Sequence, residues 1–220
     1  MKIVCVIPAF NEAKNILQVV SAVRSYVDEV IVVDDASRDA TANLAEQAGA
    51  TVLRHVINRG QGAALRTGTQ AALKANADII IHFDADNQFQ ANEIPEVIRP
   101  LLTGQAEAVL GSRFLTKKSN LPLTKRIIIH PLARFVNRLF FKIRLSDPQS
   151  GFRALKSEVA AKIKIENDGM AHCSEILYQL FKNKVKVTEV PITVTYHNYG
   201  QSFGGGLKII LDLLIQKLIK

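Results

Sequence analysis

Short apolar runs alternate with longer amphipathic stretches over the first half of the chain. The runs have the length and composition of strands, and they cover Lys2–Ile7, Glu29–Val33, Thr51–His55, Asp78–Phe83 and Glu107–Leu110. Between them, helices are predicted at about residues 11–26, 37–47, 63–75 and 93–102, with Asn11 and Ser37 or Asp39 as the first two N-caps. Strands that alternate with helices are typical of a mainly parallel, doubly wound α/β sheet flanked by helices.

The second half of the chain has fewer and less regular elements. We expect a helix, a turn-rich segment leading into a short strand, a second helix and a further strand, at Leu123–Ile143, 147–153, Ala171–Lys182 and Val185–Val190. Residues 204–220 predict a C-terminal amphipathic helix that is too short to cross a bilayer. The sequence therefore predicts one domain over residues 1–203, followed by this helix.

Positive charge is concentrated in one part of the sequence. The net charge is +8, and residues 113–146 contain nine Lys or Arg and no Asp or Glu. Such a segment attracts an anionic partner, which can be a phosphate group, an anionic membrane surface or a nucleic acid. The stripe Arg134, Arg138 and Lys142 suits a helix lying in a membrane interface, although a core helix with a solvated basic face explains the same pattern. We expect no nucleic-acid partner, because no binding motif accompanies the charge.

The cysteines and the N-terminus bear on the compartment. Cys5 and Cys173 lack metal-ligand spacing and are expected to be buried thiols, which suits a reducing cytosol. No signal peptide is expected, because the chain enters its first strand at once, and no apolar run reaches the ~18 residues of a spanning helix. We expect a cytoplasmic protein, with peripheral attachment to the cytoplasmic face of the membrane as the alternative that its basic helix suggests.

Two carboxylates follow the most apolar strand of the chain. Asp84 and Asp86 come directly after the run that ends at Phe83, and residues two apart on an extended backbone point to the same side. Gln88 extends this row. Two crowded carboxylates are unfavourable unless a positive charge lies between them, and a divalent cation held together with substrate phosphates supplies one. A polar loop with two solvated acids is the alternative interpretation of the pair.

Polar residues also end the other strands. The pairs Asn11-Glu12, Asp34-Asp35, Asn58-Arg59 and Ser112-Arg113 each follow one of the predicted strands. In open α/β sheets, ligands bind beyond the carboxyl ends of the strands. We therefore expect these pairs to line one site together with the acidic pair.

Six motifs, taken together and in order, resemble a known family. They are Ile7–Glu12, Val32–Ser37, Asn58–Gly60, Asp84–Asp86, Gly111–Phe114 and Ser150–Arg153. The chain resembles family 2 glycosyltransferases of the GT-A fold, a Rossmann-like, mainly parallel sheet. The branch it is most similar to is that of the dolichyl-phosphate mannosyltransferases and polyprenyl-phosphate glycosyltransferases, and the likeness spans about residues 3–200.

The resemblance implies a role for each matching residue. A nucleotide-sugar donor, GDP- or UDP-linked, is implied at Pro8, Asn11, Glu12, Asp34, Asp35, Asp84, Ala85, Asp86, Arg113 and Arg126. A Mg²⁺ or Mn²⁺ ion is implied at Asp84, Asp86 and Gln88. The implied catalytic residues are Asp86, Asp147 and Arg113, and the implied acceptor side includes Arg153 and Glu175.

The implied activity is that of an inverting, metal-dependent hexosyltransferase acting on a polyprenyl or dolichyl phosphate. A hydroxyl acceptor would need a general base, for which Asp147 and Glu175 are candidates, whereas a lipid phosphate is already an anion. Phe203 stands where the lipid-phosphate branch carries a lysine, so a soluble or cell-envelope saccharide remains an alternative acceptor. A more distant alternative is a non-enzymatic binder of anionic polymers that uses residues 113–146. The resemblance also leaves open whether there is a separate membrane subunit.

Overall fold

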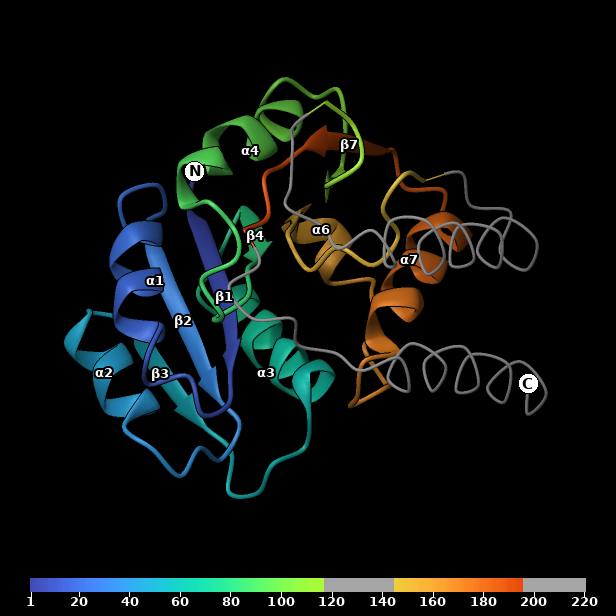
Figure 1. Ribbon diagram of the computed structural model, residues 1–220. Coiled ribbons are helices and arrows are strands. Elements are labelled where there is room, and N and C mark those ends of the chain that lie inside the picture. The colour runs from blue at the N-terminus through green and yellow to red at the C-terminus, as the bar shows by residue number, and fades with distance from the viewer. Residues whose placement is uncertain (117–144, 196–220) are drawn as a thin grey trace.

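The computed structural model describes residues 1–116 and 145–195, whose strands form one sheet in the order β3-β2-β1-β4-β6-β5-β7 (Figure 1). The strands are β1 (Ile3–Ala9), β2 (Glu29–Asp34), β3 (Thr51–Arg54), β4 (Ile79–His82), β5 (Ala108–Ser112), β6 (Arg153–Lys156) and β7 (Val187–Pro191). The pairs β3-β2, β2-β1, β1-β4 and β5-β7 are parallel. The predicted mainly parallel sheet is therefore confirmed.

Strand β6 is the exception, because it runs antiparallel to both of its neighbours. It pairs with β4 on one side and with β5 on the other, and Arg153 faces His82 of β4 and Leu110 of β5. The strand follows directly on the turn-rich segment 147–153. Its direction carries the chain from the carboxyl-terminal edge of the parallel strands back toward their amino-terminal edge.

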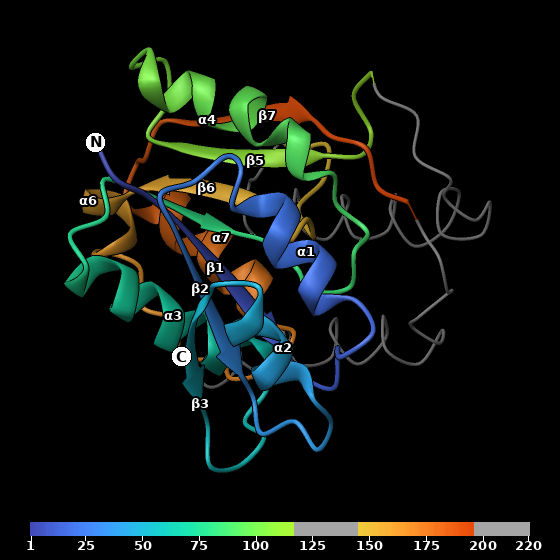
Figure 2. The same ribbon diagram turned by 90° about the vertical axis from the view of Figure 1, so that its left-hand side faces the viewer.

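Helices cover both faces of the sheet, as Figures 1 and 2 show. They are α1 (Ile16–Val23), α2 (Thr41–Gln47), α3 (Gln61–Lys74), α4 (Ile94–Leu102), α6 (Ser157–Ala160) and α7 (His172–Lys182), and the 3₁₀ turn η1 (Ala91–Glu93) precedes α4. The central strand β1 divides its side chains between two cores. Cys5, Ile7 and Ala9 pack with α1, α2 and α4, whereas Val4 and Val6 pack with α3, α6 and α7. This period-2 alternation explains why β1 is apolar at every core position.

Of the predicted caps, Asn11 and Ser37 are wrong, whereas Asp39 Oδ1 accepts a hydrogen bond from the N–H of Thr41, the first residue of α2, at 3.0 Å. Helix α1 begins at Ile16, and its N-cap Asn15 makes no side-chain cap bond. Asn11 instead has a left-handed backbone with a φ of 55°, and its Oδ1 accepts a hydrogen bond from the Arg38 N–H at 2.9 Å. Ser37 Oγ accepts from the Asn11 N–H at 2.9 Å. Both polar residues therefore tie the loops after β1 and β2 together, and so neither caps a helix.

Several predictions concern residues outside the described part of the chain. The helix Leu123–Ile143 with its basic stripe, Arg126 and the helix at 204–220 belong to this group. Among the residues that are described, none of the helices has the length and apolarity of a membrane span.

Helix α3 lies so close to the sheet that one of its residues has no room for a side chain. A Cβ added to Gly68 would be 2.3 Å from Cγ1 of Val6 and 3.0 Å from Cγ2 of Val33. Both valines belong to the centre of the sheet, where the backbone cannot easily move. The absence of a side chain at Gly68 therefore sets the distance between α3 and the sheet.

We predict that Gly68→Ala lowers the free energy of unfolding by about 1–3 kcal/mol, because overpacking a well-filled core costs that much. Helix propensity alone predicts the opposite sign, a gain of up to about 1 kcal/mol. Urea unfolding followed by circular dichroism measures the change. Gln70→Ala, at an exposed position of the same helix, is the matched control and should be neutral or slightly stabilising. Unchanged stability of Gly68→Ala would show that the helix can move away from the sheet.

Candidate active site at the carboxyl-terminal edge of the sheet

The acidic loop after β4 is anchored at both ends by aromatic side chains. Phe83 and Phe89 are buried on either side of it, with ring centroids 5.5 Å apart. Phe152 packs against both rings, at 5.0 Å from Phe83 and 5.5 Å from Phe89. Edge-to-face packing of such rings is favourable beyond the burial of their area. The aromatic cluster thus fixes the loop 84–88 against the turn that precedes β6.

Asp84 lies in a tight and partly buried place. Gln61 Nε2 donates a hydrogen bond to Asp84 Oδ1 at 2.9 Å, and a Cβ at Gly151 would be 2.4 Å from Asp84 Oδ2. Burial, and then the negative charge of Asp86, raises the pKa of the Asp84 carboxyl to about 7, although Arg153 and His172 oppose the shift. The carboxylate form of Asp84 is therefore costly until a cation binds it.

Asp86 and Gln88 form the outer part of the same loop. The Gln88 N–H donates to Asp86 Oδ1 at 3.1 Å, and Asn87 between them has a left-handed φ of 59°. The Gln88 carbonyl accepts from the Thr195 N–H at 2.9 Å, which joins the loop to the end of the described chain. The structure places Asp86 and Gln88 in one turn beside Asp84, as the sequence predicts, and their roles toward a ligand stay predictions.

This donor set fits a divalent cation that also binds a ligand. The negative charge of Asp86 makes ionisation of Asp84 less favourable, and a cation bound between the two carboxylates would remove this repulsion. Within the described residues, no group of three or more His, Cys, Asp or Glu side chains is placed to hold a metal by itself. Mg²⁺ and similar ions are commonly held by one or two carboxylates, with water and substrate phosphates as the other ligands. The acidic pair is suited to that kind of site.

The residues predicted to contact the nucleotide fall into one region, but Asp35 is already engaged. Its carboxylate is 3% exposed and accepts the main-chain N–H groups of Arg59 at 3.0 Å and Gly60 at 2.6 Å. His55 Nδ1 lies 2.6 Å from Asp35 Oδ1, and His55 Nε2 lies 2.9 Å from Thr67 Oγ1. Asp35 therefore fixes the loop between β3 and α3, and its predicted contact with a base is an additional role.

The other predicted nucleotide residues support neighbouring loops. Asp34 Oδ1 accepts from the Ser37 N–H at 3.1 Å, and the Glu12 N–H donates to Thr41 Oγ1 at 2.8 Å. Pro8 is buried in β1 opposite Val33 of β2. These bonds hold the loops after β1 and β2 at the same edge as the acidic pair.

Arg113 and Asp147 are each other's partners, which the sequence did not predict. Arg113 Nε and Nη2 donate to the two oxygens of Asp147 at 2.5 and 2.6 Å, and the Arg113 N–H adds a third bond at 3.1 Å. The Asp147 side chain is fully buried and that of Arg113 is 14% exposed. A bidentate ion pair of this kind fixes both side chains. It joins the end of β5 to the segment that leads into β6.

A second carboxylate strengthens this junction. Glu189 of β7 accepts the main-chain N–H of Ser146 at 2.9 Å and that of Asp147 at 3.0 Å. Ser112 Oγ and Ser146 Oγ are 2.5 Å apart. Glu189 was not among the predicted site residues, and no local sequence signal marks it, because its partners lie 42 and 43 positions away.

The two predicted acceptor-side residues lie in different surroundings. Arg153 is 1% exposed and donates to Cys173 Sγ at 3.0 Å, while its Nη1 has no hydrogen-bond partner among the described residues. Burial would raise the pKa of the Cys173 thiol, but the charges of His172 and Arg153 and their hydrogen bonds lower it to about 6. Glu175 accepts the main-chain N–H groups of Glu166 and Asn167, both at 3.0 Å. Arg153 is thus part of the base of the acidic site, and Glu175 holds a loop.

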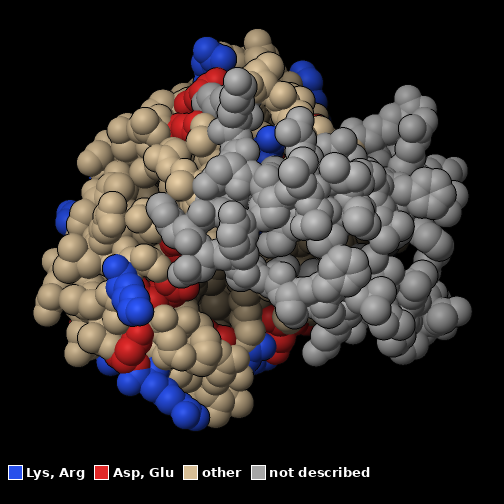
Figure 3. Space-filling view, viewed as in Figure 1, with Lys and Arg blue, Asp and Glu red and all other residues tan. Residues whose placement is uncertain are grey.

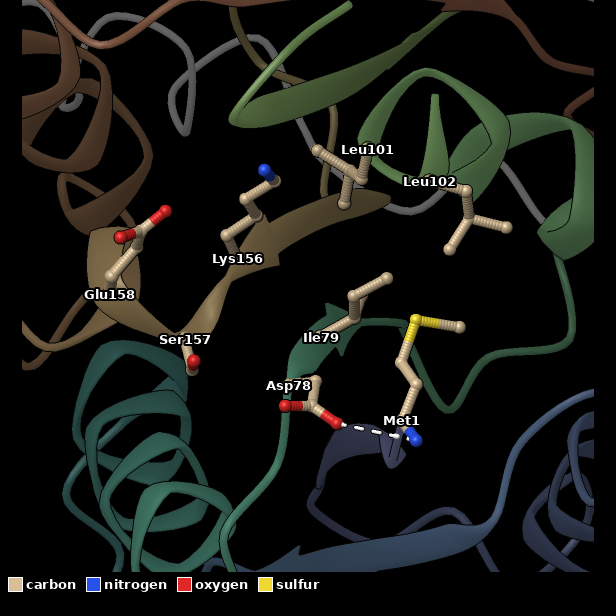
Figure 4. A pocket seen from close by; sticks show the side chains of 8 residues that line it. All are labelled: Met1, Asp78, Ile79, Leu101, Leu102, Lys156, Ser157 and Glu158. Atoms are coloured by element: carbon tan, nitrogen blue, oxygen red, sulfur yellow. Dashed lines mark ion pairs between the residues drawn. The ribbon is translucent and has the colours of Figure 1, made fainter. Parts of the chain in front are cut away.

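The described surface agrees with this location of the site. On the face seen in Figure 3, several acidic side chains border a recess toward the carboxyl-terminal edge of the sheet. A separate hollow of about 550 Å³ lies at the opposite edge, between Met1, Asp78, Leu101 and Lys156 (Figure 4). Asp78 precedes β4, whereas Asp84 follows it, so the length of this strand separates the hollow from the acidic pair. The hollow is therefore not part of the candidate site.

Open α/β sheets bind their ligands beyond the carboxyl ends of the strands, and the acidic pair of this chain lies at that edge. The sequence model of Glycosyl transferase family 2 matches residues 4–164, and the chain therefore belongs to this family of glycosyltransferases. The predicted family is confirmed. A purely non-enzymatic binder of anionic polymers is not supported by this membership.

Two relatives are named for transfer to dolichyl phosphate. The UDP-N-acetylglucosamine–dolichyl-phosphate N-acetylglucosaminyltransferase of Methanococcus voltae is 34% identical, over 98% of this chain and 96% of that protein. The dolichol-phosphate mannosyltransferase of Pyrococcus furiosus is 32% identical, over 100% of this chain and 64% of that protein.

The fold also matches solved structures of glucosyl-3-phosphoglycerate synthase from Mycobacterium tuberculosis. One contains Mg²⁺ and UDP, with a TM-score of 0.77, 22% identity and coverage of 97% of this chain and 78% of that one. Another contains Mn²⁺, UDP-glucose and phosphoglyceric acid, with a TM-score of 0.76, 22% identity and the same coverage. This likeness establishes the GT-A fold that the motifs implied.

We predict that cation binding to the acidic pair strengthens between about pH 6 and pH 8 and releases a proton near pH 7, because a metal binds the carboxylate form of Asp84. Titration calorimetry with Mn²⁺ in two buffers of different ionisation enthalpy measures that proton. Asp84→Asn should abolish both the proton release and most of the binding.

The same raised pKa affects the metal-free protein. Above about pH 4 the unfolded chain has lost the Asp84 proton, whereas the folded chain keeps it until about pH 7, so stability falls as pH rises through this window. Metal-free Asp84→Asn should therefore gain more stability over wild type at pH 8 than at pH 5. An equal effect at both pH values would contradict the raised pKa.

We predict that Arg113→Ala lowers the free energy of unfolding by about 3–5 kcal/mol, because it leaves the buried Asp147 charge without its partner. Replacing both residues with apolar ones of similar size, as in Arg113→Met/Asp147→Leu, should recover most of this loss. Arg54→Ala breaks the half-exposed pair with Glu46 and should cost less than about 1 kcal/mol. Denaturant unfolding of the four proteins tests the prediction, and equal losses for Arg113→Ala and Arg54→Ala would contradict it.

Proposed function

We propose that the chain transfers a sugar from a nucleoside-diphosphate sugar to a polyprenyl or dolichyl phosphate, with inversion at the anomeric carbon. The observation that carries this proposal is the half-buried pair Asp84 and Asp86 at the carboxyl-terminal edge of the sheet. The names of the dolichyl-phosphate relatives support the acceptor class. The Methanococcus voltae relative also favours a UDP-sugar over a GDP-sugar as the donor.

The reaction balances without an added base. A phosphate oxygen of the acceptor forms a bond to the anomeric carbon, and the bond from that carbon to the donor diphosphate breaks. The bonding electrons leave with the nucleoside diphosphate, so negative charge grows on the leaving group. A Mg²⁺ or Mn²⁺ ion held by Asp84 and Asp86, with Gln88 as a further ligand, would act as a Lewis acid toward that charge.

The chain's own residues position the donor and the acidic pair. Gln61 and Gly151 fix the Asp84 carboxylate from two sides. Asp35, where the nucleotide base is expected, is held in place because its carboxylate accepts the N–H groups of Arg59 and Gly60. Together they prepare the edge for a diphosphate before it arrives, which is the kind of preorganisation that transfer reactions need.

The ion pair between Arg113 and Asp147 changes the roles that we expect for them. The sequence predicted a phosphate contact for Arg113 and offered Asp147 as a candidate general base. In this structure Nε and Nη2 of Arg113 donate to the two oxygens of Asp147, so the carboxylate holds the guanidinium group in one orientation. Asp147 has both oxygens engaged, and a phosphate acceptor carries no proton that must be removed. We propose that Asp147 orients Arg113 beside the site.

The proposed attachment to a membrane follows from the acceptor. A polyprenyl phosphate is held in a bilayer, so the enzyme has to reach the membrane surface. A basic segment and a separate membrane subunit are two ways to do so. The basic stripe Arg134, Arg138 and Lys142 lies outside the described residues. A soluble phosphorylated or saccharide acceptor is the alternative that the assay below includes.

We predict that the protein with Mn²⁺ transfers sugar to a short-chain polyprenyl phosphate, and that Asp86→Ala lowers transfer at least about 100-fold, since it removes a group at the site of charge development. The assay measures radiolabelled lipid product from UDP-glucose, UDP-N-acetylglucosamine and GDP-mannose. Glu158→Ala, at an exposed position beyond the opposite end of the sheet, is the control and should retain full activity.

Two results would contradict the proposal. Transfer that persists both in the presence of EDTA and in the Asp86→Ala variant would contradict the proposed metal site. Transfer to a soluble saccharide, with none to the polyprenyl phosphate, would remove the lipid acceptor and leave the glycosyltransferase activity in place.

A further inference from the structure

We propose that the loop between β3 and α3, residues 55–60, is a membrane-insertion tip whose side chains Val56 and Ile57 enter the lipid surface. The inference rests on the proposed lipid-phosphate acceptor and names the part of the chain that brings the catalytic edge to the bilayer. Its basis is the exposure, the rigidity and the position of these two residues.

Val56 and Ile57 are unusually exposed for aliphatic side chains. Val56 is 97% exposed and Ile57 67% exposed, and no other large hydrophobic side chain in the described ranges is as exposed as Val56. Single exposed apolar residues are common on protein surfaces, but two adjacent ones at a loop tip are less so. In both Figure 1 and Figure 2 the loop below β3 projects beyond the carboxyl-terminal edge of the sheet. The pair therefore belongs to a loop that extends beyond that edge.

The loop is held in this shape from both sides. Before the pair, the His55 ring lies between Asp35 and Thr67, at 2.6 and 2.9 Å. After the pair, the Arg59 and Gly60 N–H groups donate to the buried Asp35 carboxylate. The backbone on each side is thus fixed, and the two side chains cannot fold back into a core. A preformed tip avoids the ordering cost that a loose loop would incur on binding.

The tip lies on the edge where the acceptor has to arrive. It follows β3, as the acidic pair Asp84 and Asp86 follows the parallel strand β4. Two other exposed apolar side chains belong to this edge, Phe10 at 45% after β1 and Leu115 at 44% after β5. Apolar groups and the acidic pair therefore lie at the same edge of the sheet, which suits a substrate whose headgroup is at a lipid surface.

A lipid surface fits this tip better than a protein partner. Two side chains cannot supply the roughly 800 Å² per partner that a stable protein interface buries. The neighbouring cations are already paired, Arg54 with Glu46 and Arg59 with Asp168, each at 3.0 Å. Attachment through the tip should therefore be apolar and largely insensitive to salt. This distinguishes it from attraction through a basic segment, which salt screens.

The chain contains no tryptophan, so one substitution provides a site-specific probe of insertion. We expect the fluorescence of Ile57→Trp to shift to shorter wavelength on addition of vesicles of phosphatidylcholine and phosphatidylglycerol, and to be quenched by brominated lipid. Leu102→Trp, at a 49% exposed position at the end of α4 beside the hollow of the opposite edge, is the matched control and should show neither effect. The shift should persist in about 0.5 M NaCl, where charge attraction is screened. No shift for Ile57→Trp would overturn the proposal.

Loss of the apolar pair gives the converse test. Val56→Ser/Ile57→Ser should bind the same vesicles about tenfold more weakly in co-sedimentation, because burying two aliphatic side chains contributes at least that much. The double variant should transfer sugar normally to a water-soluble, short-chain polyprenyl phosphate and more slowly to a long-chain acceptor embedded in vesicles. Equal rates of transfer to the embedded acceptor by wild type and double variant would overturn the proposed insertion of the tip into lipid.

These outcomes separate the tip from the proposed function. If wild type transfers to neither lipid phosphate, the acceptor assignment fails. If it transfers to both and the double variant does the same, only the insertion tip fails. A wild-type dimer that the double variant converts to a monomer in sedimentation velocity would assign the pair to a protein interface and overturn insertion into lipid.

Discussion

The structure depends on keeping the Asp84 carboxylate next to Asp86 in a place where water cannot fully solvate it. Such a pair is unfavourable by itself, and its position has to be imposed by the surrounding fold. The rings of Phe83, Phe89 and Phe152 impose it from the core side, and Gly151 allows the preceding turn to approach the carboxylate closely. The free energy gained by burying the aromatic cluster thus holds the acidic loop in a conformation in which the two carboxylates repel each other. A bound cation would relieve this repulsion.

The acidic residues at this edge divide into two groups by their partners. Asp35, Glu175 and Glu189 accept main-chain N–H groups from loops distant in sequence. Asp147 belongs with them, because Arg113 occupies both of its oxygens. These carboxylates join loops, since each one satisfies N–H groups that would otherwise be buried without a partner. Asp84 and Asp86 instead lie side by side in one loop, where the negative charge of Asp86 helps to raise the pKa of Asp84, and this makes them the candidate metal site among the acidic residues of this edge.

The joined loops also connect the site to its surroundings. The Arg113–Asp147 pair and Glu189 hold the end of β5 beside the start of the turn before β6, so the two sides of the site cannot separate without breaking buried bonds. On the other side, Asp35 fixes the loop that carries Val56 and Ile57 outward. The proposed lipid contact and the donor region therefore share one structural element. A change in the contacts that hold the loop 55–60 should therefore affect both the proposed lipid contact and the donor region.

The sequence by itself determined the strand and helix order of residues 1–112, the mainly parallel sheet and the edge at which the candidate site lies. Burial and strand ends leave a local pattern, because the residues concerned are neighbours along the chain. The motifs also led to the family, and they marked Asp84 and Asp86 as the centre of the site. Only the tertiary structure decided the antiparallel direction of β6, the loop-tying role of Asn11 and Ser37, and the pairing of Arg113 with Asp147. It likewise revealed Gln61 and Glu189, whose partners are 23 and 42 or more positions away. A side chain's chemistry is readable in the sequence, but its partner depends on which distant loop the fold brings within hydrogen-bond distance.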